Sequence, residues 1–185
     1  SETVLSDRIF PYALLVLAAA SAAAGYFLCS AKEHQLHDLE RIPRSRLWGT
    51  ALGALALYWC SVHAKPLVSD GIAQYLVYLA ILCTWLGFMF LDFVLARSFG
   101  GLLILAAHYF LYESFALKAP LGPLFASLCL IMGTFGIVIC GKPYYLRDII
   151  RKTVLAKEWK YGTCTVLSVY AVSGTFYGLW ALFCR

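Results

Sequence analysis

Six long runs of apolar residues, separated by short polar breaks, occupy most of this chain. A helix needs about 20 residues to cross the hydrocarbon of a bilayer. The run from Ile72 to Leu95 has this length and contains a single ionisable side chain, that of Asp92, close to its end. Runs of this kind predict helices that span a membrane.

The composition agrees with this prediction. Apolar residues make up 62% of the chain and charged residues 14%, against about 45–50% and 25% in soluble proteins. In water, such a chain would expose more apolar surface than a monomer tolerates. We therefore expect an all-α, polytopic bundle of six transmembrane helices, forming one domain over residues 1–185 because six spans leave only loops between them.

Proline and glycine fall mainly at the joints between the six predicted spans, as at Pro66, Gly100 and Pro120. A helix can stop there without leaving backbone groups unpaired in lipid. A cleaved signal peptide in the first 25 residues is the weaker alternative, since the start is not basic and the apolar run exceeds the usual 7–15 residues. The predicted spans are residues 9–30, 47–64, 72–95, 100–117, 121–140 and 161–183.

Basic residues are distributed unevenly between the loops. Six spans place residues 31–46, 96–99 and 141–160 on one side of the membrane, and these segments hold 11 of the 15 basic residues. The positive-inside bias then puts these segments in the cytoplasm and both termini outside, with a bacterial inner membrane as the favoured location and a eukaryotic organelle left open. The four basic residues predicted outside are Arg8, Lys65, Lys118 and Arg185.

Residues 144–160 are too charged to span a membrane but have a helical pattern. Leu146, Ile149, Ile150 and Val154 recur at helical spacing. We expect an amphipathic helix on the cytoplasmic surface that contacts anionic lipid headgroups, with a solvated connector as the alternative. The predicted headgroup contacts are Arg147, Arg151, Lys152, Lys157 and Lys160.

Small residues predict where the helices touch. Helices in lipid associate by close packing rather than by the hydrophobic effect, so small residues at i and i+4 mark contact faces. Such pairs are Gly49 with Gly53, Gly174 with Gly178, and Ala18 with Ala22.

The predicted spans contain four ionisable residues that could carry chemistry: His63, Asp92, His108 and Glu113. In span four, His108 shares a helix face with Tyr112, and Tyr109 shares the neighbouring face with Glu113. These side chains could form a proton relay or a quinone site. The alternative is a neutral His108 that hydrogen-bonds to an adjacent helix.

Asp92 lies near the predicted cytoplasmic end of span three, and Arg97 follows the boundary. An ion pair between the two, or a cap for span four, is the favoured interpretation of Asp92.

The sequence predicts no cofactor and no metal site. Haem b held by His63 or His108 is a minor alternative, because the two histidines stand at different depths. The seven cysteines form no CxxC motif and are interpreted as packing residues. No basic, aromatic-rich soluble face suggests nucleic acid as a partner.

The favoured function is that of a structural or accessory subunit in a larger membrane complex, rather than an enzyme. Charged clusters inside the spans are lacking, the loops are short, and packing residues are abundant. The expected partners are membrane lipids and other membrane protein subunits. Two alternatives remain: a transporter or channel with a polar path near His108 and Glu113, and a membrane enzyme acting on lipid or quinone.

Overall fold

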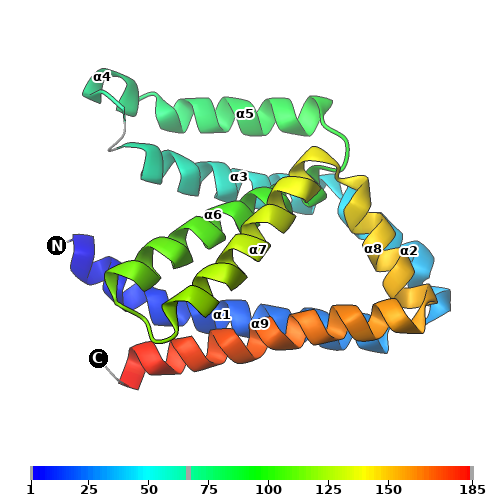
Figure 1. Cartoon of the computed structure of the whole chain (residues 1–185). Helices are drawn as coiled ribbons and strands as arrows, with labels where there is room; N and C mark the ends of the chain where they lie inside the picture. Colours follow the sequence, from blue (N-terminus) through cyan, green and yellow to red (C-terminus); the bar gives the residue numbers. More distant parts are fainter. Residues whose placement is uncertain (1, 66–67, 184–185) are drawn as a thin grey trace. The chain divides into compact units, whose positions relative to one another are not determined.

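The computed structural model describes residues 2–65 and 68–183, and no strand occurs among them (Figure 1). The all-α prediction is thus confirmed for the described residues. The long helices are α1 (Glu2–Ser30), α3 (Arg46–Ala64), α5 (Leu76–Phe90), α6 (Val94–Ala116), α7 (Gly122–Gly141) and α9 (Lys157–Phe183). The short elements are α2 (Leu36–Arg41), α4 (Asp70–Ala73), α8 (Tyr144–Leu155) and the 3₁₀ turns Glu33–Gln35 and Ile42–Arg44.

Within the described residues, five segments are long and apolar enough to cross a membrane, and they indicate an integral membrane protein. The predicted second span forms α3, a helix of 19 residues, but it does not join the five. Polar and aromatic residues such as Tyr58, Trp59 and His63 lower its hydropathy. The five segments are Ile9–Ser30, Gly71–Phe90, Val94–Ala116, Gly122–Gly141 and Lys157–Phe183.

The break between the third and fourth predicted spans lies at residues 91–93, not at 96–99. Phe93 has a φ of 57°, a left-handed conformation that turns the chain here. Leu91 and Phe93 are apolar, so the turn is hidden within an apolar run. As a result, Asp92 lies in the connection and Arg97 lies in the first turn of α6.

The amphipathic segment is also shorter than predicted. Helix α8 ends at Leu155, and α9 begins at Lys157. The side chains of Thr153 and Val154 are buried, and the hydroxyls of Thr153 and Thr163 lie 3.0 Å apart. Lys157 and Lys160 therefore belong to the first turn of α9, rather than to the segment predicted as an interfacial helix.

Contacts divide the chain into two compact units, residues 1–36, 107–131 and 149–185 in the first and residues 37–106 and 132–148 in the second. In the first unit, α1 and α9 pack antiparallel along their length (Figure 1). At one end, the Lys160 ammonium donates a hydrogen bond to the Ala31 carbonyl (3.4 Å). Near the other end, a Cβ added to Gly178 would lie 3.0 Å from the Leu15 side chain. The carboxyl end of α1 and the amino end of α9 are therefore neighbours.

The first half of α7 also belongs to the first unit and packs against α9. The Tyr170 hydroxyl donates to the Leu128 carbonyl (2.8 Å), and the ring centroids of Phe125 and Tyr177 are 4.5 Å apart. On α1, the buried ring of Phe10 packs against the ring of Phe110 on α6, with the two ring centroids 6.3 Å apart. The core of this unit is therefore aromatic on the side of α1 and α9 that faces α6 and α7.

In the second unit, glycines allow close helix contacts. The Ser98 hydroxyl of α6 donates to the Gly49 carbonyl of α3 (2.8 Å). A Cβ on Gly53 would lie 2.8 Å from that same hydroxyl, and one on Gly100 would lie 2.7 Å from the Gly136 carbonyl. The predicted contacts at Gly49, Gly53, Gly174 and Gly178 are confirmed, because an added Cβ at each would come within 3.0 Å of a residue on another helix.

Helix α5 packs beside α3 in the second unit and has no buried residue. A shallow groove between the two is lined by Thr50 and Ala54 of α3 and by Thr84 and Phe88 of α5. Residues from the first half of α3 thus lie beside residues from the second half of α5, so the two helices run antiparallel. Most of the large apolar side chains of α5 are exposed.

Candidate functional site

Helix α6 carries the predicted polar residues, and it places them on different faces. Ala107, Phe110 and Glu113 are buried, with Glu113 only 6% exposed. His108 and Tyr112 are exposed, one helical turn apart. The helix therefore has a packed face and an outward face that presents an imidazole above a phenol.

The outward pair has no partner within the described chain. Neither the His108 imidazole nor the Tyr112 hydroxyl takes part in a hydrogen bond, ion pair or ring contact with the described residues. His108 lies three residues from the middle of α6, about 4–5 Å along the axis at the rise of an α-helix. In a spanning helix, this imidazole would stand near the centre of the hydrocarbon.

The predicted combination of His108 with Glu113 is not assembled in this structure. Glu113 lies on the packed face beside Ser114, whose hydroxyl donates to the Leu111 carbonyl (2.9 Å). Tyr109 is half-buried, and the centroid of its ring lies 6.4 Å from that of the Phe10 ring. The tyrosines are divided in the same way, because Tyr109 turns inward while Tyr112 is 68% exposed.

The two other predicted residues lie at helix ends. His63 is exposed in the last turn of α3, where its Nδ1 is 3.1 Å from the Trp59 carbonyl and its ring meets the Trp59 ring. Asp92 is exposed and forms no ion pair with the described residues, so the predicted pair with Arg97 is wrong. The Arg97 guanidinium donates instead to the Cys140 carbonyl (2.9 Å).

No group of three or more His, Cys, Asp or Glu side chains in the described residues could hold a metal ion. His63 is on α3 and His108 is on α6, and neither belongs to such a group among the described residues.

The basic residues predicted to contact lipid lie on α8 and in the first turn of α9. Arg147 is 3.4 Å from the carboxylate of its neighbour Asp148, and Arg151 is exposed. The Lys152 ammonium lies 5.0 Å from the centre of the Trp159 ring. Lys160 donates to Ala31, as described above. Among these, Lys157 is exposed and has no partner in the described chain.

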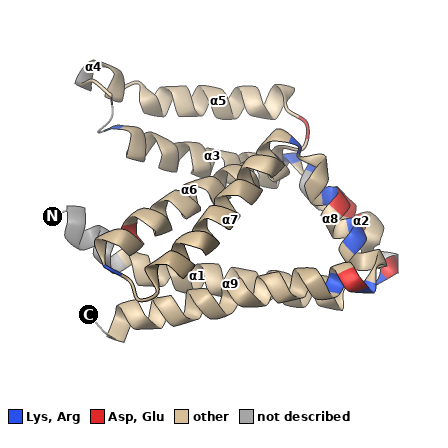
Figure 2. Cartoon of the chain, in the orientation of Figure 1, with Lys and Arg blue, Asp and Glu red and all other residues tan. Residues whose placement is uncertain are grey.

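The net charge of the chain comes from a few segments. Residues 31–46, 91–97 and 141–160 hold eleven basic and six acidic residues, whereas the remainder holds four of each. Figure 2 shows charges gathered on α2, α8 and the connection after α5, with none on α5 or α7. Arg185, counted in the predicted outer set, lies outside the described residues.

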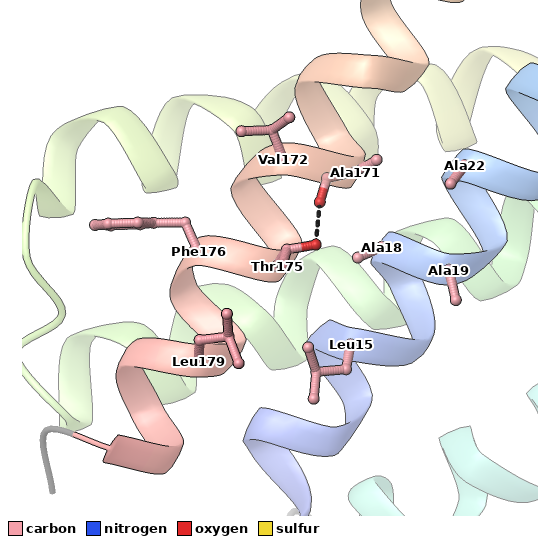
Figure 3. Close-up of a pocket in the computed structure, with 9 residues that line it drawn as sticks. All are labelled: Leu15, Ala18, Ala19, Ala22, Ala171, Val172, Thr175, Phe176 and Leu179. Atoms are coloured by element: carbon pink, nitrogen blue, oxygen red, sulfur yellow. Dashed lines mark hydrogen bonds between the residues drawn. The ribbon is translucent and has the colours of Figure 1, made fainter.

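An apolar groove of about 580 Å³ runs between α1 and α9 in the first unit (Figure 3). Leu15, Phe176 and Leu179 line it, together with alanines of both helices, and Figure 3 shows Leu15 and Leu179 pointing toward each other. The hydroxyl of Thr175 donates to the Ala171 carbonyl (2.7 Å) and so presents no free donor to the groove.

The structure joins Cys29 of α1 to Cys164 of α9 in a disulfide, which the interpretation of all seven cysteines as packing residues missed. The two residues are 135 positions apart in the sequence, and no motif surrounds them. Only the pairing of α1 with α9 identifies them as partners. Cys60, Cys83, Cys129 and Cys140 are free.

Comparison of the chain with known protein families, with curated proteins and with solved structures finds no match.

Proposed function

We propose that this chain is a six-span membrane protein that acts as an accessory subunit of a larger membrane complex. Such a subunit crosses the membrane an even number of times and binds a protein partner within it.

The antiparallel pairing of α1 with α9 supports an even number of crossings. If both helices span the membrane, residues 31 and 157 lie on the same side, because the ends that carry them are neighbours. The chain between them must then cross an even number of times. Only three of the five apolar segments fall between them, so a fourth crossing is needed.

Helix α3 supplies that crossing. Its 19 residues extend about 28 Å at helical rise, close to the ~30 Å of hydrocarbon. It lies antiparallel beside α5, an apolar helix without a buried residue. Trp48 and His63 are near its two ends, where headgroups and water accommodate polar and aromatic rings.

The basic segments give the orientation. The positive-inside bias places residues 31–46 and 141–160 in the cytoplasm and both termini on the other side. On that surface, α8 lies in the interface with its basic residues at headgroup level. A bacterial inner membrane is the proposed location.

The exposed pair His108 and Tyr112 is the observation that carries the accessory role. A polar group left without a hydrogen bond in hydrocarbon costs several kcal/mol. Polar side chains inside spans therefore usually face a protein partner or a watery cavity. Because this pair has no partner within the described chain, we infer that a helix of another subunit covers it and bonds to the imidazole.

The spanning Ser and Thr residues favour binding over transport. Thr84, Ser127 and Thr165 each donate to the carbonyl of their own helix four residues earlier. Hydroxyls satisfied in this way do not need a water-filled path. The outward face of α6 is then the polar surface that needs a partner.

Photocrosslinking in the native membrane tests the partner. A photoreactive phenylalanine analogue replaces Tyr112, and a matched chain carries it at Tyr78 of α5, which is 70% exposed. We expect the probe at position 112 to crosslink to a single protein, which gives an adduct of one constant mass. The probe at position 78 should crosslink to lipid alone. His108→Leu should reduce the adduct at 112, whereas His108→Gln should retain much of it, because the amide still hydrogen-bonds.

Three outcomes would contradict the accessory role. They are equal adducts at positions 78 and 112, an adduct that His108→Leu leaves unchanged, and an adduct whose partner is a second copy of this chain.

A further inference from the structure

The groove between α1 and α9 continues toward the basic end of these helices. A second hollow, lined by Tyr26, Cys29 and Ser168, shares Ala22, Ala171 and Val172 with the first. On α1, the combined groove extends from Leu15 to Cys29, about 21 Å at helical rise. It therefore spans roughly two-thirds of the ~30 Å hydrocarbon thickness.

The groove exists because small residues bring the helices together and leave their outer side unfilled. A Cβ on Gly174 would lie 3.0 Å from the Leu14 carbonyl and 3.1 Å from the Ala18 side chain. Ala19 and Ala22 are exposed beside this contact, and larger side chains line the groove with them. The result is a narrow apolar channel that opens toward lipid.

A free cation lies beyond the basic end of the groove. Lys157, Tyr161, Cys164 and Ser168 follow one another at i, i+4, i+7 and i+11, so they share one face of α9. The last two line the groove, and Tyr161 is 73% exposed. Unlike Lys160 and Lys152, Lys157 has no partner in the described chain.

We propose that this groove binds one anionic glycerophospholipid. An acyl chain lies along the alanines of the groove, and the phosphate lies beside the Lys157 ammonium. The rings of Tyr26 and Tyr161 stand at headgroup depth, where amphipathic rings are favoured. A lipid fits better than a partner helix, because the channel is apolar along its length and meets an unpaired positive charge at one end only.

Lipid binding by the purified full chain tests the proposal. The chain is exchanged into mixed micelles of phosphatidylglycerol or phosphatidylcholine, and bound lipid is counted by native mass spectrometry. We expect one retained phosphatidylglycerol. Lys157→Gln should reduce the preference over phosphatidylcholine about fivefold, in line with the contribution of one lysine near an anionic surface. Lys118→Gln is the control, because Lys118 is exposed in the connection between α6 and α7.

Filling the groove tests the place of the acyl chain. Ala22→Phe should abolish retention of either lipid, whereas Ala23→Phe should not, because Ala23 is exposed but does not line the groove. If Ala22→Phe fails to fold, Ala19→Leu is a smaller substitution that also fills the groove. Ala20→Leu is its matched control, because Ala20 is exposed but does not line the groove. Equal retention in a matched pair, or equal retention of the two lipids by the parent chain, would overturn the proposal. A protein partner that is lost in Ala22→Phe while lipid remains would overturn it in favour of a helix.

Discussion

Arg97 and Cys140 exchange two hydrogen bonds across the contact between α6 and α7. The Arg97 guanidinium donates to the Cys140 carbonyl (2.9 Å), and the Cys140 thiol donates to the Arg97 carbonyl (3.2 Å). Arg97 lies in the first turn of α6, and Cys140 lies in the last turn of α7. The guanidinium therefore satisfies a carbonyl that the end of α7 leaves open, and it places a positive charge at the negative end of that helix.

Replacing Arg97 should weaken the contact between α6 and α7. We expect Arg97→Leu to lower the free energy of unfolding by about 1–3 kcal/mol, since it removes a charge-assisted hydrogen bond and the charge at the helix end. Arg147→Leu is the control, because Arg147 bonds only to its neighbour Asp148 in the described structure and should change stability by less than about 0.5 kcal/mol. Thermal unfolding in detergent measures both. Equal midpoints for the two variants would contradict this role of Arg97.

Two adjacent glycines of α6 should respond in opposite ways to the same substitution. A Cβ on Gly100 would lie 2.7 Å from the Gly136 carbonyl and 2.9 Å from the Cys140 thiol, whereas one on Gly101 would meet nothing within 4 Å. Gly100→Ala should cost about 1–3 kcal/mol, because backbone cannot move aside without shifting a helix. Gly101→Ala should be neutral or stabilise by up to about 1 kcal/mol through helix propensity. The same unfolding assay tests the pair, and a loss of stability in Gly101→Ala would contradict the contact.

The sequence was sufficient to predict the helical class, because long apolar runs leave few alternatives. It could not place the end of α5. Leu91 and Phe93 are apolar, so nothing in the hydropathy of the run marks the turn that the φ of Phe93 makes. Asp92 is the available signal, but its place in a long apolar run predicts a residue inside a span.

Side-chain partners were harder to predict than helices. The pairing of Cys29 with Cys164 depends on which helices are neighbours, and the sequence contains no repeat or motif that says so. Likewise, spacing alone placed His108 with Tyr112 and Tyr109 with Glu113. Which pair faces outward depends on the packing of Phe10 against Phe110, two residues that are far apart in the sequence.

In the purified chain kept under oxidising conditions, the disulfide should hold the two fragments together after a cut. The Cα atoms of Cys29 and Cys164 are 6.7 Å apart, within the range that a disulfide spans. After proteolysis at a site inserted following Arg41, we expect the amino-terminal fragment to remain with the rest in a denaturing gel and to separate on reduction. Cys29→Ser should separate without reductant. Cys60→Ser, which removes an exposed free cysteine, should behave like the parent chain, and separation of the parent itself would contradict the bond.

Protease access from each side of the membrane tests whether α3 crosses. One chain carries a cleavage site after Lys32 and another carries it after Ser69, both exposed positions that flank α3 in the sequence. If α3 spans, the two sites lie on opposite sides. In sealed vesicles that expose the outer face, protease should then cut after Ser69 and spare the site after Lys32, and inverted vesicles should give the reverse. Cleavage of both sites from one face would leave three crossings between α1 and α9, and the antiparallel pairing of these helices could not then hold in a membrane.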